Sequence, residues 1–381
     1  MNKNSGYYCL FYALISDIIG FDNGLKSIDK SNLKCTNLNE ASKHAGYTNY
    51  IVYKFISHGA YSNINISKKL ASNASIFLLS VYDSFVTSKL TDPSNINLNT
   101  QTIIDNLIVR MSEYFNSDKN KQNRLYDNDL IEKLDKLSDF NYNYSKFSYD
   151  EEDNSCYPLV RGVPIGIIFS GKKNRDKLLE ISIESCRTTH NNAISYLGTF
   201  TTALFISLSL EKVNPNKWIH ILLNFFLEGK IVNYIKKTIP KKDIKPHLTE
   251  INEFQYLINN YKLLRFDKDS KYIPSSEDKY FMFLNDKSLY MYAKFGLQGI
   301  FNPGSNGIDC IIYAYDAFME SGSNFEKLIY NSMLHVGVSH YTGCLAGALY
   351  GSYYGNSDLQ SKFDNFDLKN KLDKLTNLHY H

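Results

Sequence analysis

Histidine, cysteine and carboxylate side chains are the first candidates for chemistry in this chain, and they are spread along it rather than clustered. His340 is the most unusual, because it stands alone and an imidazole nitrogen suits zinc or nickel better than magnesium. A lone histidine is more often a buried, hydrogen-bonded residue than a metal ligand, and we favour that interpretation. Cys156 lies near the basic Arg161 and has the chemistry of a nucleophile, but the sequence places no general base beside it.

Four further ionisable residues stand close to apolar segments. Asp17 and Asp309 are interpreted as helix caps or internal hydrogen-bond partners, with a place in a ligand cleft as the alternative. Arg187 and His190 are interpreted as a structural pair in the core rather than as a catalytic pair. None of these residues alone specifies a reaction.

Composition and charge exclude several classes of protein. The chain has 381 residues, of which 43% are hydrophobic and 21% charged, as in a globular protein with a sizeable core. A formal net charge of +3 is too small to steer nucleic acid, and we predict no nucleic-acid partner. The densest basic stretch is predicted to be a solvated loop, with a binding patch as the alternative. It comprises Lys236, Lys237, Lys241, Lys242 and Lys245, interrupted by Pro240 and Pro246.

Cysteine usage and hydropathy indicate the compartment. The six cysteines are widely spaced and form no CxxC pair, so neither a disulfide framework nor a zinc ribbon is expected. No signal peptide is visible, since the apolar run over residues 7–15 is soon followed by Asp17. The longest apolar stretch, residues 196–210, is shorter than the ~20 residues of a membrane span. We therefore expect a cytoplasmic protein with no membrane partner.

The elements that would position these residues are predicted to be helices. Apolar residues recur at helical spacing, whereas no strand pattern is long enough for a central sheet. Residues 26–54 are more polar and receive no assignment, and residues 116–155 are predicted to form a short helix and an irregular, exposed loop. The expected helices cover residues 7–18, 72–87, 103–115, 178–187, 192–210, 218–226, 309–320 and 325–333.

A repeated glycine marks the last core helix. Gly343, Gly347, Gly351 and Gly355 recur every four residues, which places them on one face of a helix. Each should cost about 1 kcal/mol relative to alanine. Such a cost is tolerable where another backbone approaches closely, so we predict a buried helix in close contact with a neighbour. A membrane dimer motif is disfavoured because the run is short.

Four blocks of motif, in order along the chain, cover nearly all of it. The clearest reads Ile-Ser-Ile-Glu-Ser-Cys-Arg-Thr-Thr-His over residues 181–190, with Tyr-Leu-Gly at 196–198. The others are Ser-Asp-Ile-Ile-Gly at 16–20, Gly-Ser-Asn-Gly-Ile-Asp at 304–309 with Ala-Tyr-Asp-Ala at 314–317, and residues 335–347. In all four the chain resembles the ADP-ribosylarginine hydrolases, or ADP-ribosylglycohydrolases, which have closely similar motifs at this spacing.

The resemblance implies an all-α, single-domain orthogonal helical bundle of the ADP-ribosylglycohydrolase type. We expect this domain to span residues 1–356, with residues 116–155 as an irregular insert. Residues 357–381 are polar and are expected to form a C-terminal helix or tail.

The resemblance also implies a site with two Mg²⁺ that bind ADP-ribose and activate water, and this chain departs from the family there. Two close Mg²⁺ need several carboxylate ligands. The family's last motif supplies two aspartates, which align with Val338 and His340, while Ser339 and Thr342 persist. Its earlier Asp-Asp-Thr motif aligns with Asn73, Ala74 and Ser75. We therefore expect no metal and no cofactor.

The family's phosphate-binding loop has changed as well. Its Gly-Gly-Cys-Gly aligns with residues 154–157, where Tyr157 adds bulk and Pro158 lacks an N–H donor. Some residues that could still bind a ligand remain. They are Asp17, Cys156, Gly304, Ser305, Asn306, Gly307, Asp309 and Ser339.

Three functions stay open on this basis. The first, which we favour, is a pseudoenzyme: the scaffold is kept, the metal site is lost, and an unknown protein partner is bound. The second is an active hydrolase whose metal site is rebuilt from surviving carboxylates or through His340. The third is metal-free binding of ADP-ribose or a related nucleotide through residues 304–307 and Asp309.

Overall fold

The chain folds into helices joined by turns and loops, and no strand occurs among the residues that the structure describes. The structure is a computed structural model, and it describes residues 3–22, 38–90, 98–137, 148–274, 303–355 and 357–380. The predicted all-α class is therefore confirmed. Cys35, one of the six cysteines, lies outside the described residues.

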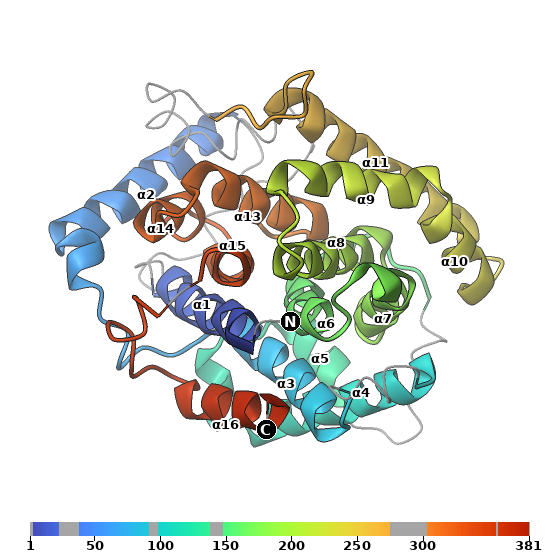
Figure 1. Cartoon of the computed structure of the whole chain (residues 1–381), viewed down its shortest axis with the longest axis horizontal. Helices are drawn as coiled ribbons and strands as arrows, with labels where there is room; N and C mark the ends of the chain where they lie inside the picture. Colours follow the sequence, from blue (N-terminus) through green and yellow to red (C-terminus); the bar gives the residue numbers. More distant parts are fainter. Residues whose placement is uncertain are drawn as a thin grey trace.

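The most apolar helices form the centre of the molecule. Figure 1 shows α8 (Ala193–Leu210) and α15 (Ser339–Tyr353) in the middle, beside α1 (Lys3–Phe21), α6 (Gly162–Ile168) and α13 (Gly307–Ser321). By length and composition α8 alone among the described helices would suffice to cross a membrane, and 94% of it is buried in the protein. Such burial is what a core helix requires.

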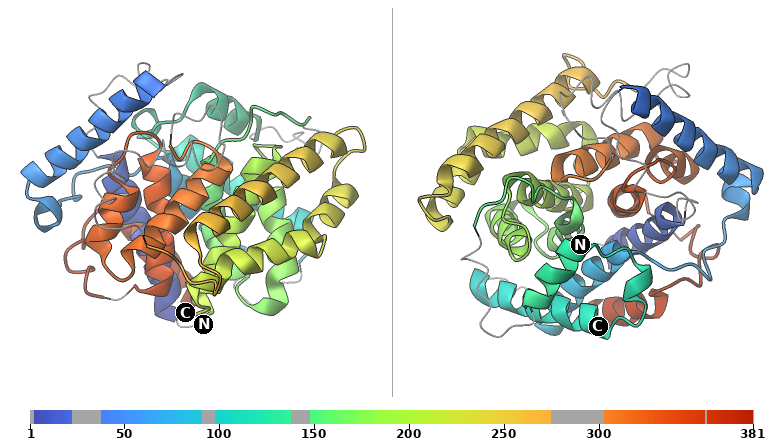
Figure 2. Two further views of the ribbon diagram at one scale, coloured as in Figure 1. Left: turned by 90° about the horizontal axis from the view of Figure 1, so that it is seen from above. Right: turned by 180° about the vertical axis from the view of Figure 1, so that it is seen from behind.

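The other helices surround this centre (Figures 1 and 2). On one side lie α3 (Asn73–Thr87), α4 (Thr100–Ser117), α5 (Asn128–Leu137) and α16 (Lys369–Tyr380). The opposite side and flanks are formed by α2 (Leu38–Ser57), α7 (Arg175–Arg187), α9 (Trp218–Leu227), α10 (Lys230–Thr238), α11 (Ile244–Arg265) and α14 (Phe325–Ser332). Short 3₁₀ turns connect them at Ala60–Asn63, Lys121–Asn123, Tyr157–Arg161, Lys172–Asn174 and Pro215–Lys217.

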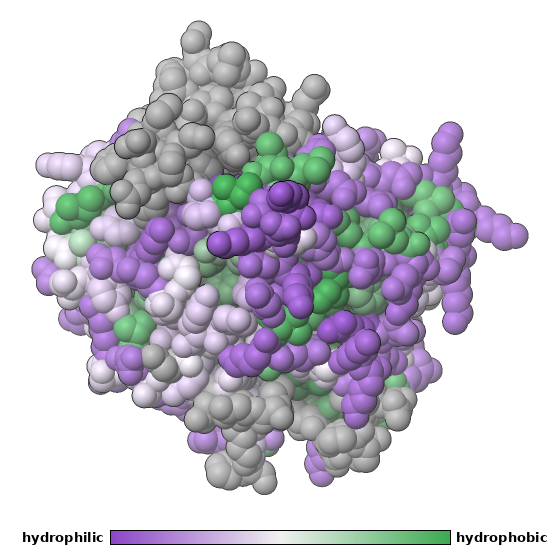
Figure 3. Space-filling view, turned by 45° about the horizontal axis from the view of Figure 1, so that its top comes forward, coloured by the Kyte–Doolittle hydropathy of each residue, from purple (hydrophilic) through white to green (hydrophobic). Residues whose placement is uncertain are grey.

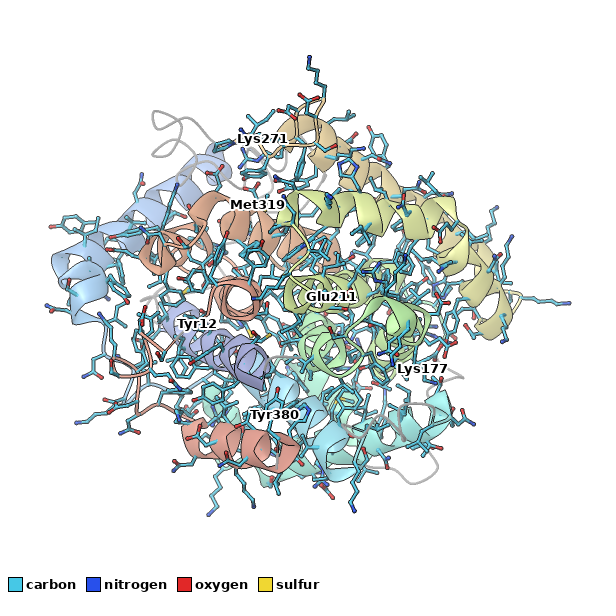
Figure 4. All side chains as sticks on the ribbon, in the orientation of Figure 1. Tyr12, Lys177, Glu211, Lys271, Met319 and Tyr380 are labelled. Atoms are coloured by element: carbon cyan, nitrogen blue, oxygen red, sulfur yellow. The ribbon has the colours of Figure 1, made fainter. Side chains whose placement is uncertain are left out.

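The glycine face of α15 packs directly on α1, as predicted. A Cβ atom at Gly347 would lie 2.4 Å from the carbonyl oxygen of Tyr12, and one at Gly351 would lie 2.2 Å from that of Tyr8. At these positions only glycine leaves room for the neighbouring backbone. The ring of Tyr12, labelled in Figure 4, fills the space beside this contact and packs on Tyr350, with 5.1 Å between centroids. Gly355 lies past the end of α15, so the glycine pattern outlasts the helix.

A buried ion-pair network joins α11 to α13. The guanidinium of Arg265 contacts Asp316 at 2.8 Å and Glu320 at 2.6 Å, and the side chains of all three residues are nearly inaccessible to solvent. The hydroxyls of Tyr261 and Tyr272 each donate to Asp316 at 2.9 Å. The charges are thus compensated inside the protein by both ion pairs and hydrogen bonds.

The five-lysine stretch is not the loop that the sequence suggested. Lys236 and Lys237 lie in the last turn of α10, and Lys245 lies in the first turn of α11. Pro246 is tolerated in that first turn because the N–H groups there have no partner within the helix. All five lysines are exposed, so their predicted solvation is correct and only their conformation was wrong.

Two further segments contain helices. Residues 38–57 lie mostly in the stretch that received no assignment and form α2, whereas residues 128–137 form α5, which agrees with the short helix predicted within residues 116–155. The outer surface is mixed: in Figure 3 hydrophobic residues form separate patches between hydrophilic ones rather than one continuous face.

Candidate functional site

Asp17 lies where α1 meets the start of α3. Its side chain is fully buried, and it accepts hydrogen bonds from the backbone N–H of Ser72 at 3.0 Å, from the hydroxyl of Ser72 at 2.6 Å, and from the hydroxyl of Ser75. Ser72 in turn caps α3 by accepting from the N–H of Ala74. Asp17 therefore acts as an internal hydrogen-bond partner that fixes the first turn of α3.

This carboxyl titrates at an unusually high pH. Burial raises the pKa of Asp17 to about 6, although the hydrogen bonds from Ser72 and Ser75 lower it. In the unfolded chain an aspartate titrates near about 4. A pKa that is higher in the folded state means that the protonated form is favoured by folding, so ionisation of Asp17 destabilises the fold as the pH rises through this interval.

Replacing Asp17 with asparagine should remove that pH dependence. The free energy of unfolding of Asp17→Asn, relative to the parent protein, should rise by up to about 3 kcal/mol from pH of about 4 to about 6 and then stay constant. Asp153 and Glu250 also have raised pKa values, but they are present in both proteins and cancel in the difference. Urea unfolding of both proteins at several pH values measures this difference in the free energy of unfolding. The exposed Asp176→Asn is the control, and its difference from the parent protein should not change with pH. If the difference for Asp17→Asn also does not change with pH, the raised pKa of Asp17 is contradicted.

The segment aligned with the family's Asp-Asp-Thr contains no carboxylate and is used for packing. Asn73 is buried, donates from Nδ2 to the carbonyl oxygen of Leu125 at 2.9 Å, and accepts no hydrogen bond at Oδ1 from any described residue. Its backbone N–H donates to the carbonyl oxygen of Arg124 at 2.9 Å. Ala74 offers no ligand atom in its side chain.

The start of α15 is likewise occupied by internal contacts. The N–H of Val338 donates to the carbonyl oxygen of Pro303 at 2.9 Å, and Ser339 Oγ donates to that of Gly20 at 2.9 Å. Thr342 Oγ1 donates to the carbonyl oxygen of Ser332 at 2.8 Å. Among the described residues no group of three or more histidine, cysteine, aspartate or glutamate side chains is placed to hold a metal ion.

His340 lies in an aromatic environment. Its ring is 5.8 Å from that of Phe21 and 5.1 Å from that of Tyr341, and the residue is only 6% exposed. This surrounding matches the interpretation of a buried structural histidine better than that of a metal ligand.

Tyr341 is the residue that sequence analysis missed. It stands where the family motif has a small serine, and it is completely buried. Its ring is 5.5 Å from that of Tyr157, and burial raises the pKa of Tyr341 far above its usual range, with Cys156 and Asp17 among the neighbouring groups. The phenol ring of Tyr341 therefore fills space between the two segments aligned with the family's metal motifs, residues 73–75 and 338–342, and the loop of residues 154–157. The exchange of serine for tyrosine at this position was the available signal.

The loop of residues 154–157 pairs with the loop of residues 304–309. The N–H of Cys156 donates to the carbonyl oxygen of Ser305 at 2.8 Å, and the N–H of Gly307 donates to that of Asn154 at 2.9 Å. The N–H of Gly304 donates to Asp309 Oδ2. These backbone donors, which a phosphate would need, are thus engaged within the protein. The structure therefore brings together two groups of predicted ligand-binding residues, Cys156 and residues 304–307.

Asn306 and Asp309 organise the start of α13. Asn306 caps the helix, since its Oδ1 accepts from the N–H groups of Ile308 at 3.1 Å and Asp309 at 2.7 Å. The carboxylate of Asp309 then holds Gly304, whose φ of +80° lies in the left-handed region. Asp309 is therefore a partner within its own loop, as interpreted from the sequence.

The predicted pair of Arg187 and His190 has different partners. Arg187 contacts both carboxylate oxygens of Glu184 at 3.0 Å, and His190 Nδ1 bonds to Thr189 Oγ1 at 2.7 Å. His190 Nε2 lies 3.6 Å from Asp153, but burial lowers the pKa of His190 well below its usual value. A neutral imidazole makes no ion pair, so this is a polar contact only.

The cysteines show no sign of an activated nucleophile. The five described cysteines, Cys9, Cys156, Cys186, Cys310 and Cys344, are buried free thiols. The guanidinium of Arg161 donates to the carbonyl oxygen of Ser185 and to Thr188 and Thr189 Oγ1. Burial raises the pKa values of Cys9, Cys186, Cys310 and Cys344, so these four residues remain thiols.

Comparison with known proteins gives consistent relatives. The ADP-ribosylglycohydrolase family model matches residues 71–378. The chain is 28% identical over 374 residues to the putative ADP-ribosyl glycohydrolase L444 of Acanthamoeba polyphaga mimivirus, covering 96% of this chain and 68% of that protein. It is 24% identical over 392 residues to the ADP-ribosylhydrolase ARH1 of Dictyostelium discoideum, covering 98% and 93%.

A solved structure shares the fold. The ADP-ribosylglycohydrolase-related protein complex superposes with a TM-score of 0.58 at 12% identity, covering 99% of this chain and 97% of that one. At this identity the likeness concerns the arrangement of helices alone.

Proposed function

Because the chain belongs to the ADP-ribosylglycohydrolase family, we propose that it is a member without hydrolase activity that acts as a protein-interaction scaffold. The main support is the donor set around the metal motifs. Asp17, a carboxylate beside these motifs, accepts hydrogen bonds from Ser72 and Ser75, and Asp309 accepts one from Gly304. Neither Val338 nor Ala74 can replace a lost carboxylate. A pair of Mg²⁺ does not fit such a set, since its charge would go unopposed.

Two further observations support the same proposal. The buried ring of Tyr341 takes up room between the motifs, and the N–H groups of Gly304, Gly307 and Cys156 are bonded internally. The ring of Tyr341 opposes metal binding, and the bonded N–H groups oppose binding of a pyrophosphate. The alternatives, a hydrolase with a remodelled metal site and a metal-free binder of ADP-ribose, each require one of these features to rearrange. A cytoplasmic location stays a prediction.

Titration calorimetry with ADP-ribose, with and without Mg²⁺, tests the proposal. We expect no heat of binding under either condition. Heat that requires Mg²⁺ would support the hydrolase, and heat that does not would support the nucleotide binder. The Dictyostelium ARH1 relative, titrated in parallel, controls for the quality of ligand and buffer.

Restoring the two aspartates of the last motif should not restore catalysis. The double variant Val338→Asp/His340→Asp still has Asn73 and Ala74 in the other motif and Tyr341 in the space between them. We therefore expect no release of ADP-ribose from an arginine-ADP-ribosylated protein. Turnover by this double variant above that of the parent protein would show that the remaining changes are unimportant.

A further inference from the structure

A cavity of about 390 Å³ lies away from the metal motifs, between four segments of the chain. They are the loop of residues 149–154, the first turn of α8, residues 246–257 of α11 and the start of α13. Its volume falls in the range of small-ligand sites. Nothing in the metal motifs accounts for it.

The cavity is strongly acidic. Glu151, Glu250 and Glu253 line it, and among the described residues that line it there is no lysine or arginine. Glu250 is 7% exposed and held in place, since it accepts from Asn192 Nδ2 and from the N–H of Ala193, both at 2.8 Å. Such a surface repels a pyrophosphate and attracts a cation. Lys245, the closest lysine in sequence on α11, lies one turn before the lining residue Thr249 and does not line the cavity.

Asn306 gives a second, independent indication. It lines the cavity, it is 6% exposed, and its Oδ1 accepts two N–H groups of α13. Those two donors fix which side of the amide is oxygen, so Nδ2 is on the opposite side. This nitrogen makes no hydrogen bond with any residue that the structure describes. It is not among the buried polar atoms that are sealed from solvent, so water can bond to it, and a ligand that offers an acceptor can take the place of that water.

We propose that this cavity binds a lysine or arginine residue of a partner polypeptide. The cationic head group contacts the exposed Glu253 and Glu151 and is attracted by the charge of Glu250, whose oxygens already accept from Asn192, Ala193 and Tyr149. The aliphatic stem packs on the apolar wall that includes Ile194 and Leu257. The backbone carbonyl oxygen of the peptide accepts from Asn306 Nδ2. A free polyamine satisfies the carboxylates but has no acceptor for this amide. The inference rests on the proposed function, because it specifies the chemistry of the partner.

Binding of short peptides, followed by ligand-observed NMR, tests the proposal. The probes are acetyl-Ala-Ala-Xaa-Ala-Ala-amide, in which Xaa is arginine, lysine or the neutral citrulline, together with putrescine. Measurements at pH of about 8 keep Glu250 ionised, since burial raises its pKa to about 7. The two basic peptides should bind at least about tenfold more tightly than the citrulline peptide. Equal binding of all three would overturn the role of charge.

Two variants separate the contacts without threatening the fold. Glu253 is exposed, and Glu253→Gln should weaken both basic peptides by about threefold. Serine is also a good helix cap, so Asn306→Ser keeps α13 capped while removing Nδ2. It should weaken the basic peptides by about fivefold and leave putrescine unchanged. Glu132→Gln on α5, whose side chain is 69% exposed, is the matched control and should change nothing.

The outcomes distinguish this inference from the function on which it rests. Putrescine binding as tightly as the peptides, with no effect of Asn306→Ser, would identify a polyamine site and overturn the peptide partner. If no peptide binds and the titration with ADP-ribose also gives no heat, only this inference is overturned. Mg²⁺-dependent heat with ADP-ribose, with peptide binding intact, would overturn only the loss of hydrolase activity.

Discussion

Gly347→Ala is expected to destabilise the protein by about 3 kcal/mol or more. In an open helix the same change would stabilise by about 1 kcal/mol, because alanine has the higher helix propensity. Here the new methyl would lie 2.4 Å from the carbonyl oxygen of Tyr12 and 2.3 Å from the hydroxyl of Ser16. Backbone atoms cannot yield without moving α1 as a whole, so the overpacking penalty outweighs the propensity gain. The midpoint of urea unfolding measures the change.

Gly343→Ala provides the matched comparison on the same face of α15. Its Cβ would meet Ser16 O and the flexible side chain of Met333, each at 2.9 Å, so the clash is milder. We expect a smaller loss of stability than at Gly347. A gain of stability at Gly347, or the reverse order of the two variants, would mean that α1 and α15 are not in backbone contact.

Arg265→Leu is the second substitution with a large expected effect. It leaves the carboxylates of Asp316 and Glu320 buried without their cation, for which a loss of about 3–5 kcal/mol is typical. Burial without a cation favours the neutral, protonated form of a carboxyl group, so the loss of stability should shrink as the pH falls. Unfolding free energies measured at about pH 7 and about pH 5 reveal this dependence.

Arg110→Leu controls for the general cost of replacing an arginine. Arg110 on α4 is partly exposed, with a side-chain accessibility of 31%, and pairs with the exposed Glu113 at 2.7 Å, whereas its contact with the less exposed Asp83 is longer, at 3.8 Å. We expect a loss below about 1 kcal/mol with little dependence on pH. If the two arginine variants lose similar stability, the network around Asp316 has no special role.

Helices were predictable where the signal is local. Ser72, Asn192 and Asn306 cap α3, α8 and α13 by bonds to N–H groups two or three residues away, and the apolar spacing follows directly after them. The glycine spacing of α15 was also informative, because glycines in a helix are destabilising and are tolerated where a neighbouring backbone packs closely against them. The family motifs named residues 154–157 and 304–309 as possible ligand-binding loops, but only the structure shows that the two loops pair.

The pattern failed where one helix has apolar residues on two faces. In α2, Tyr50, Tyr53 and Ile56 are more than half exposed, whereas Ile51 is buried. Apolar residues pointing both inward and outward blur the helical period on which the prediction depends. Pro246 had a similar effect, because a proline reads as a loop signal although the first turn of a helix accepts it.

Contacts between distant residues were out of reach. The sequence suggested that Arg187 pairs with His190, but a glutamate one turn earlier in the same helix is the better-placed partner. Tyr341 could be recognised as larger than the serine that it replaces, but only the positions of Tyr157 and Asp17 reveal which space it fills. The cavity around Glu250 depends on four segments and has no signature in any one of them.

The seam between α1 and α15 joins residues near positions 8–16 to residues near 343–351, so the core closes only when residues more than three hundred positions apart meet. During translation the apolar α1 must wait for its partner while more than three hundred residues emerge from the ribosome. Contacts of such high sequence separation slow folding and prolong the exposure of sticky surface. The newly made protein is therefore expected to depend on chaperones, and premature termination before α15 should yield an aggregating product.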